Sequence, residues 1–304
     1  MNKIHRVKSI TEFHEFRQLP KPQHPLISVV NVEDIQHPPG EEPMSLVLDY
    51  YNISLKRNFS GKFHYGQQDY DFDEGIMFFI APGQVFRVEH DTNQPLRQSG
   101  WMLLIHPDFL WNTPLAKSIR QRGYFDYSVN EALFLSSKEE DIITGIIRTI
   151  HQEYQNNIDK FSQDIIISQI ETLLNYAERF YHRQFITRKI TNHQILDRLE
   201  KLLEEYFTAG DLIRKGLPAV HDIAAQLNVS PNYLSSLLKV LTGQSTQQHI
   251  HGKLIEKAKE KLSTTDASIS EIAYDLGFEH PQSFSKLFKT KTKLSPLEFR
   301  QSFN

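Results

Sequence analysis

The chain has no cysteine among its 304 residues. This absence excludes disulfide bonds, thiolate zinc sites, cysteine nucleophiles and sensing through thiol oxidation. The chain also lacks any apolar run near the ~18 residues of a membrane span, and its first residues show no signal-peptide character. We therefore expect a cytoplasmic protein with no membrane partner.

Catalytic and metal-binding motifs are missing as well. The chain has no Gly-x-Ser-x-Gly nucleophile motif and no phosphate-binding loop. The histidines between residues 20 and 110 are scattered, without His-x-His spacing: His24, His37, His64, His90 and His106. We expect neither a catalytic residue, nor a metal, nor a cofactor.

Charge is unevenly distributed along the chain, whose formal net charge is −3. From Asp211 to the C-terminus there are 12 Lys and Arg residues against 9 Asp and Glu residues, and after Pro281 five basic residues accompany the single acid Glu298. The C-terminal part therefore has the sign that attracts phosphates. A solvated helix face would have the same composition, so charge permits DNA binding without establishing it.

The N-terminal part favours β-structure. Residues 20–110 contain short apolar runs separated by turn residues, which predicts an all-β sandwich or barrel. The runs lie at residues 27–30, 44–48, 53–55, 76–80 and 102–105.

From about Lys138 the apolar period changes to steps of three and four, which predicts helices with one apolar seam each. The seam residues are Ile143, Ile147, Ile150 and Tyr154, then Ile166, Ile170, Leu173, Ala177 and Phe180. Either both seams cover the β-domain, or the second helix, about 161–185, presents part of its seam to another subunit of a homodimer. We assign residues 1–130 to the β-domain and 131–186 to a helical dimerisation region.

A polar, basic segment at residues 187–193 is interpreted as a linker. Thr191 or Asn192 is expected to cap a helix that starts near Gln194. The last domain then spans residues 194–304.

An internal repeat lies in this last domain. Residues 222–227 match residues 271–276 at an offset of 49, and residues 232–239 match residues 282–289 at an offset of 50. Each copy is predicted to be a helix, a tight turn and a second helix. In the first copy Ser230 caps the second helix and Pro231 opens it. In the second copy Gly277 suits a left-handed turn and Pro281 opens the helix.

The second helix of each copy has one apolar face and one polar face. Such a pair of polar faces is typical of recognition helices, because Asn, Gln, Lys and Ser side chains can read base edges in the major groove of double-stranded DNA. Solvent-facing polar residues are the alternative interpretation. The predicted DNA-binding residues are Asn232, Ser235, Ser236 and Lys239, and Gln282, Ser285, Lys286 and Lys289.

Between the copies, residues 246–262 predict one amphipathic helix. Its apolar positions include Ile250, Leu254 and Leu262. We expect this helix to hold the two recognition helices apart. Basic residues on or near its outer side are expected to meet phosphate: His251, Lys253, Lys257 and Lys261.

The second copy contains Ile272-Ala273, Leu276-Gly277-Phe278, Ser283-Phe284, Phe288-Lys289 and a closing Ser295-Pro296-Leu297-Glu298-Phe299-Arg300. With these motifs, residues 195–304 resemble the DNA-binding domain of the AraC/XylS transcription regulators. The resemblance implies base-contacting helices at residues 231–241 and 281–290. Ser235 and Ser236 depart from the larger polar residues often found there, so the first copy is expected to read fewer bases directly.

Residues 75–86 are similar to the cupin-like sensor domain of the same family. Metal-dependent cupins hold an ion through histidines and a glutamate. Here His64 stands alone and Phe86 occupies the position of the late histidine. The resemblance therefore implies a domain without a metal, with a small-molecule effector, a homodimer and RNA polymerase as further partners of an activator.

The predicted fold class is α+β, with an N-terminal cupin-like β-barrel and flanking helices, then an all-α domain with two helix-turn-helix units. The function predicted is sequence-specific DNA-binding transcription regulation, without enzymatic activity. Two alternatives are a cupin-type enzyme with an appended DNA-binding module, and an architectural protein that binds DNA with little sequence preference.

Overall fold

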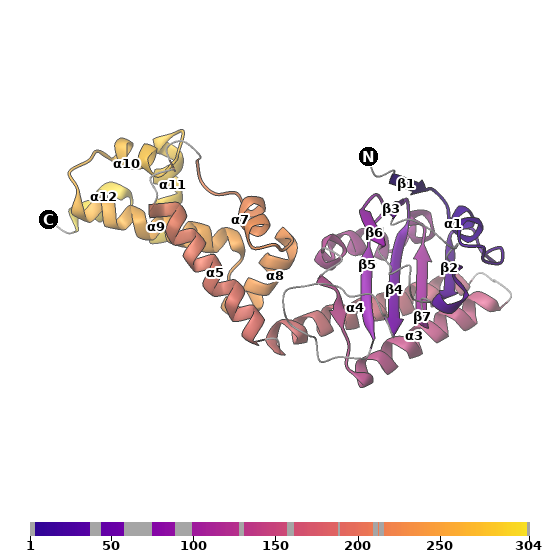
Figure 1. Cartoon of the computed structure of the whole chain (residues 1–304). Coiled ribbons are helices and arrows are strands. Elements are labelled where there is room, and N and C mark those ends of the chain that lie inside the picture. Colours follow the sequence, from indigo (N-terminus) through magenta and orange to yellow (C-terminus); the bar gives the residue numbers. More distant parts are fainter. Residues whose placement is uncertain are drawn as a thin grey trace. The chain divides into compact units, whose positions relative to one another are not determined.

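A computed structural model describes residues 4–36, 44–57, 75–88, 99–127, 131–156, 161–187, 189–208, 212 and 216–302. The chain divides into two compact units, Met1–Gln184 and Phe185–Asn304. The first mixes strands and helices and the second is helical, which confirms the predicted α+β class (Figure 1). None of the helices in the described ranges combines the length and the apolar character needed to span a membrane.

Unit one contains two sheets. A three-stranded sheet has the order β1-β3-β6, and a five-stranded sheet has the order β2-β7-β4-β5-β8. All five predicted runs lie in strands, whereas β1, β6 and β8 were not predicted. The strands are β1 Ile4–Val7, β2 Ile27–Asn31, β3 Met44–Leu48, β4 Tyr51–Arg57, β5 Ile76–Ile80, β6 Val85–Val88, β7 Ser99–Ile105 and β8 Leu133–Phe134.

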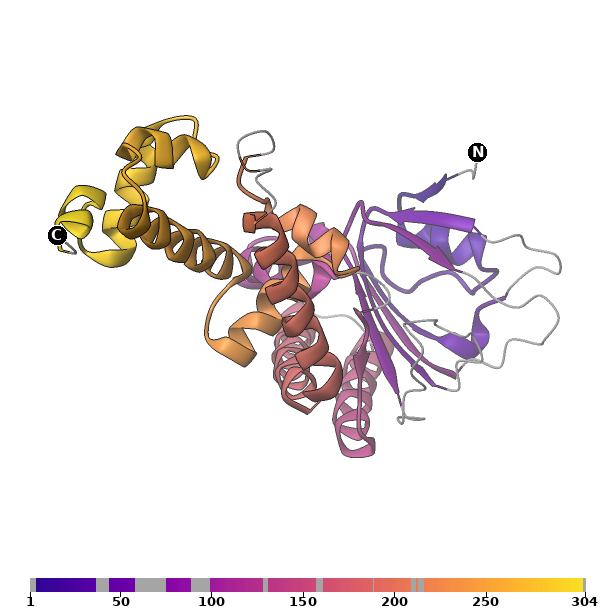
Figure 2. The same cartoon turned by 60° about the vertical axis from the view of Figure 1, so that its left-hand side comes forward.

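The five-stranded sheet is covered on both faces. Helix α3, Ser137–Gln155, packs on β2 and β7. On the other face lies helix α1, Ile10–Phe16, together with β1 and β3, and apolar residues of both sheets form one buried cluster there. Figure 2 shows α3 on one side of the strands and β1 with α1 on the other. The short strands predicted either a sandwich or a barrel, and the described strands form two sheets, as in a sandwich.

The helical seams belong to the interior of unit one. The nine seam residues of α3 and of α4, Ser162–Thr187, are only 0–4% exposed. The α4 side chain of Tyr181 stacks on Tyr124 at 5.6 Å, and the Tyr124 hydroxyl donates to the Leu174 carbonyl at 3.0 Å. This burial favours the first alternative, in which the seams cover the β-domain. A homodimer would have to use other residues.

The segment interpreted as a linker is largely helical. Helix α5 is Lys189–Thr208, so it begins before Gln194, and Asn192 lies inside it rather than capping it. The Asn192 amide instead donates to the Phe185 carbonyl at 2.5 Å. The prediction of a helix start near Gln194 was therefore wrong.

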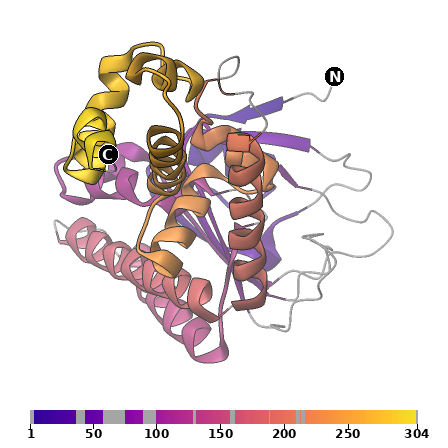
Figure 3. The same cartoon turned by 90° about the vertical axis from the view of Figure 1, so that its left-hand side faces the viewer.

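Within the described residues, unit two contains the end of α4, helix α5 and two sets of three helices. Helices α7, α8 and α9 form the first set, and α10, α11 and α12 form the second. Figure 3 looks along α9, on which α5, α8, α10 and α12 pack. The bounds are α7 Val220–Gln226, α8 Pro231–Thr242, α9 Thr246–Thr264, α10 Ile269–Asp275, α11 Pro281–Thr292 and α12 Pro296–Gln301.

The structure confirms the predicted turns of both helix-turn-helix units. The Ser230 side chain accepts the Tyr233 N–H at 3.2 Å, and Pro231 opens α8. Gly277 has φ +80° at the turn before α11, and Asn228 takes the same left-handed conformation in the first unit, with φ +58°. Each turn leads into a second helix that packs on the first, α8 on α7 and α11 on α10.

The repeat extends further than the sequence match suggested. The Thr242 hydroxyl donates to the Leu238 carbonyl at 2.8 Å and accepts the Gln244 N–H at 3.3 Å. Fifty residues later, Thr292 makes the same two bonds, with Phe288 and Leu294, at the same distances. The next helix begins with a capping box in both copies, at Ser245 and at Ser295. The repeated unit is thus three helices rather than two.

The left-handed glycines offer a test of the second turn. A Cβ on Gly277 would lie 2.8 Å from the Leu212 carbonyl oxygen, whereas a Cβ on Gly243, which has φ +75°, would meet nothing within 4 Å. We expect Gly243→Ala to cost ~1–2 kcal/mol of unfolding free energy from backbone strain alone. Gly277→Ala should cost more, because the carbonyl must also move. Urea unfolding of the full-length variants, followed by circular dichroism, measures both; equal losses would contradict the close approach.

Candidate nucleic-acid interface

The polar face of α8 is partly open to solvent. Asn232 and Lys239 are exposed, whereas Ser235 and Ser236 are half-buried. The opposite face is closed, since Leu234, Leu237 and Leu238 are 0% exposed. The division into an inner and an outer face therefore agrees with the sequence pattern, but the two serines lie closer to the protein than the two longer side chains.

Ser235 already has a structural partner. Its hydroxyl shares a hydrogen bond with the Thr246 hydroxyl at 3.0 Å, and Thr246 is the fully buried first residue of α9. This bond ties α8 to the start of α9. The equivalent of Thr246 in the second copy is Pro296, which has no hydroxyl, so Ser285 has no such bond to the next helix.

The polar face of α11 is more open. Gln282, Lys286 and Lys289 are exposed, and Ser285 is half-buried. Behind them Phe284 and Phe288 are 0% exposed, with their ring centroids 5.8 Å apart. Leu287, the other large apolar residue of this stretch, is only half-buried. The aromatic pair therefore carries most of the packing that holds this face outward.

The cations of α11 and α8 are available to an anionic partner. Within the ranges that the structure describes, neither Lys239 nor Lys286 has an ion pair. Lys289 lies near Glu298, whose pKa is held below its usual value by the Ser295 backbone N–H and, to a smaller degree, by the Lys289 charge. The second copy thus presents the stronger positive face.

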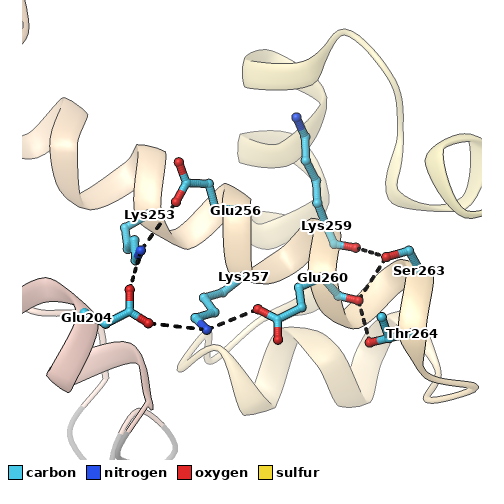
Figure 4. Close-up of polar contacts among 8 residues, drawn as sticks. All are labelled: Glu204, Lys253, Glu256, Lys257, Lys259, Glu260, Ser263 and Thr264. Atoms are coloured by element: carbon cyan, nitrogen blue, oxygen red, sulfur yellow. Dashed lines mark hydrogen bonds and ion pairs between the residues drawn. The ribbon is translucent and has the colours of Figure 1, made fainter.

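The cations of α9 are instead engaged within unit two. Glu204 of α5 lies between Lys253 and Lys257 and binds both, the latter at 3.7 Å (Figure 4). Glu256 and Glu260 of α9 itself lie 3.5 and 3.1 Å from these same two lysines. The hydrogen bond to Glu204 raises the pKa of Lys253.

The other two basic positions of α9 are also occupied. The Lys261 ammonium lies 2.8 Å from the Asp275 carboxylate of α10. His251 shares a hydrogen bond with Gln247 at 3.2 Å, and burial, followed by the nearby Lys291 charge, lowers its pKa. The expectation that α9 supplies phosphate contacts is thus not supported by its surroundings. Sequence spacing within α9 gave no signal of Glu204, which is far away along the chain.

The resemblance motif at the C-terminus has a structural role. Arg300 donates to the Leu262 carbonyl at 3.3 Å and to the Ala267 carbonyl at 2.7 Å. Phe299 packs against Phe288 with ring centroids 5.5 Å apart. Helix α12 therefore fixes the end of α9 and the inner side of α11, which positions the polar face of α11.

Of the five histidines between residues 20 and 110, the structure describes His24 and His106. His37, His64 and His90 lie outside the described residues. In the remaining part, no three His, Asp or Glu side chains are grouped as a metal ion would require. Phe86, at the place of the late cupin histidine, packs partly buried against the core cluster.

Two family models match the chain. The helix-turn-helix domain matches residues 223–302, and the AraC-like ligand binding domain matches residues 49–169. The first match covers both polar faces described above. The second covers most of the five-stranded sheet and the start of α4.

Curated relatives match most of the chain. The HTH-type transcriptional activator RhaS of Salmonella schwarzengrund is 24% identical over 259 residues, which is 83% of this chain and 86% of RhaS. The HTH-type transcriptional regulator YfiF of Bacillus subtilis, itself uncharacterised, is 22% identical over 254 residues, which is 84% of this chain and 77% of YfiF.

Solved structures match with low overall scores. The C-terminal domain of AraT, a response regulator from Geobacillus stearothermophilus, is 31% identical over 36% of this chain and 84% of that chain, with a TM-score of 0.32. ToxT from Vibrio cholerae is 14% identical over 91% of this chain and 97% of that chain, with a TM-score of 0.29.

Lysine substitutions test whether DNA binds the lysines of α11 rather than the ion-paired lysines of α9. We expect Lys289→Gln to reduce the slope of log affinity against log salt by about 1, as for one lost phosphate or base contact. Lys257→Gln should leave the slope unchanged, because carboxylates already neutralise that charge. Titration of duplex DNA at several salt concentrations measures both slopes, and equal reductions would contradict the assignment.

Proposed function

The chain is a DNA-binding transcription regulator of the AraC family, and we propose that it reads its target through the exposed faces of α8 and α11. In this proposal each helix enters a major groove, and the base contacts come from the polar residues predicted from the sequence other than Ser235, whose hydroxyl is bonded to Thr246. The observation that carries it is the repetition, fifty residues apart, of the Thr242 and Thr292 hydroxyl bonds and of the capping boxes at Ser245 and Ser295.

The polar faces of α8 and α11 are exposed for the same physical reason. A left-handed residue in the turn before each helix, Asn228 or Gly277, is followed by packing of α8 on α7 and of α11 on α10, so the opposite side of each helix is left to solvent. Asn and Gln near the helix start match the two-pronged pairing with adenine, and Lys matches guanine. A solvated helix would have no need of the same residue types at the same positions twice.

The two helices are proposed to contribute unequally. Ser235 is bonded to Thr246 and Ser236 is half-buried, which leaves Asn232 and Lys239 as the longer readers of α8. Helix α11 has three exposed long side chains: Gln282, Lys286 and Lys289. We infer that the α11 half-site is the more strictly defined one.

The distance between the two faces depends on α9. Its nineteen residues, Thr246–Thr264, span about 28 Å at the rise of an α-helix. That length is comparable with one turn of DNA, ~34 Å. The proposal is that both recognition helices bind one face of the duplex in successive major grooves.

Regulation is proposed to act through unit one. The match to a ligand binding domain supports control by a small effector, and RNA polymerase and a homodimer are proposed as further partners. The curated relatives are transcription regulators by name, which supports a regulator without an enzymatic step.

Selection from random duplex DNA by the full-length protein at physiological salt tests the proposal. We expect enrichment of a motif with two conserved blocks about one helical turn, ~10 base pairs, apart. A single block would show that only one unit reads bases. No enrichment, together with a strongly salt-dependent affinity, would show an architectural protein instead.

The Lys286 side chain provides the sharpest single test. Lys286→Ala should relax the preference at about one base pair and cost about 1–3 kcal/mol there, because one base contact is lost. Ser235→Ala is the matched control and should leave base preference unchanged, since its hydroxyl bonds to Thr246. Competition binding against single-base variants of the selected site measures the effect. A loss of equal size on all sequences would make Lys286 a phosphate contact.

A further inference from the structure

The last residues of α4 belong to the helical unit. The division between the units falls inside this helix, and Phe185 is the first residue of unit two. The two family models match residues 49–169 and 223–302, so neither match includes Phe185. The sequence prediction also started the last domain later, at residue 194. The role of Phe185 therefore follows only from what it contacts.

Phe185 packs against α8, the first recognition helix. Its ring meets the ring of Tyr233 edge to face, with the centroids 5.2 Å apart and an interplanar angle of 77°. Both side chains are buried, Phe185 at 3% exposed and Tyr233 at 7%. Aromatic pairs in this geometry attract each other beyond the burial of their area, so the contact fixes orientation as well as distance. A residue from outside the repeat thus helps to hold α8.

Tyr233 lies at the start of the polar face of α8. It is the third residue of the helix, and the Ser230 hydroxyl accepts its N–H at 3.2 Å. It directly follows Asn232, an exposed residue of the polar face. Because neighbouring residues of a helix share one hydrogen-bonded turn, a shift of the Tyr233 ring also moves Asn232. Side chains of a binding site need to be held within about 0.5 Å of their productive geometry, so such a shift matters for base contacts.

Helix α11 has no equivalent contact among the described residues. At the offset of 50, Ser283 occupies the position of Tyr233, and Ser283 is exposed and carries no ring. Ring contacts on the inner side of α11 come from the second copy itself: Phe284 with Phe278 at 5.5 Å, and Phe288 with Phe299 at 5.5 Å. The second copy therefore holds its recognition helix with its own residues, whereas the first copy also uses a residue of α4.

Two buried amides fix the backbone around Phe185. The Asn192 amide of α5 donates to the Phe185 carbonyl at 2.5 Å. The residue before Phe185 is Gln184, whose side chain accepts the Phe134 N–H at 2.9 Å and donates to the Ala132 carbonyl at 3.2 Å. A glutamine amide has the acceptor and donor of a peptide group, so Gln184 binds the edge strand β8 as another strand would. Asn192 and Gln184 are each 1% exposed. One peptide bond thus joins a residue fixed on β8 to the residue that contacts α8.

We propose that Phe185 is a positioning residue for DNA reading: it fixes the start of α8 through Tyr233, so the end of α4 controls the bases read by α8 and not those read by α11. A change at the edge strand β8 that moves Gln184 is passed to Phe185 and then to α8. Unit one therefore acts on one block of the target site. This inference rests on the proposed function of α8 and α11 and names the residue through which that function is regulated.

Duplex DNA binding by full-length Phe185→Leu tests this role. The probe is the duplex selected by the unchanged protein, with single-base variants in each block. The block relaxed by Lys286→Ala is assigned to α11, and the block relaxed by Lys239→Ala is assigned to α8. We expect Phe185→Leu to lower discrimination in the α8 block about fivefold, the lower end of what one base contact supplies, and to leave the α11 block unchanged. A loss in both blocks, or in neither, would overturn the proposal.

Phe180→Leu is the matched control. Phe180 lies five residues earlier on α4, in unit one, and is 4% exposed, so the substitution removes a ring of similar burial. Both variants should lower the melting temperature by about 2–4 °C. Only Phe185→Leu should change base preference, and an equal change from Phe180→Leu would reduce the effect to a general loss of stability. If circular dichroism shows Phe185→Leu to be unfolded, Phe185→Met gives the same readout, because its flexible side chain fills the gap without a ring.

A substitution of Gln184 tests the connection to β8. Gln184→Met removes both bonds to β8 and should lower discrimination in the α8 block only. Tyr124→Phe is its control, because it removes another buried bond to α4, from the Tyr124 hydroxyl to the Leu174 carbonyl, and should change neither block. An α8 block unchanged by Gln184→Met would contradict control from β8.

A double-variant cycle tests the ring contact without DNA. The melting temperature is compared for full-length Phe185→Leu, Tyr233→Leu and the double variant. We expect the fall of the double variant to be smaller than the sum of the two single falls, because both substitutions remove the same contact. Additive falls would overturn the proposal. An unchanged protein that enriches no DNA motif contradicts the proposed function, whereas an enriched motif with equal losses in both blocks for Phe185→Leu contradicts only this inference.

Discussion

The buried apolar stripe of α9 is the interaction on which the helical unit depends. Ile250, Leu254, Ala258 and Leu262 are 0–2% exposed, and α5, α8, α10 and α12 all pack on this helix. Each large aliphatic side chain buried there contributes about 1.5–3 kcal/mol, whereas an exposed ion pair contributes about 0–1 kcal/mol. The packing of this stripe therefore determines the positions of α8 and α11. The ion pairs of the α9 lysines contribute less free energy to that arrangement.

Charge in unit two is divided between structure and recognition. Lys253, Lys257 and Lys261 of α9 lie against carboxylates of α5, α9 and α10, which weakens their attraction for phosphate. Within the described ranges, Lys239 of α8 and Lys286 of α11 are exposed and have no ion pair. These two helices therefore present positive charge that no carboxylate of the described residues neutralises.

Strand β4 of unit one shows that alternating apolar and polar residues do not establish which face of a strand is exposed to solvent. Strand β4 reads as apolar at Ile53 and Leu55 and polar at Asn52, Ser54 and Lys56, the usual pattern of a half-exposed sheet. The second layer formed by α1, β1 and β3 covers the polar side as well. Sequence alternation tells which residues share a face, but only the packing of distant segments decides whether that face meets water.

The sequence by itself determined the features whose physical cause is local. Ser230 with Pro231 and Gly277 with Pro281 set the turns, since caps and left-handed residues act within about four positions. The spacing of apolar residues identified the inner faces of α8 and α11, and the repeat identified these two helices as an equivalent pair. Tertiary structure alone decided the contacts between distant residues: Ser235 with Thr246, Glu204 with Lys253 and Lys257, and the start of α5 at Lys189. Such contacts form only when distant segments pack against each other. The free energy of that packing is a sum over the whole unit, so no single segment of the sequence determines it.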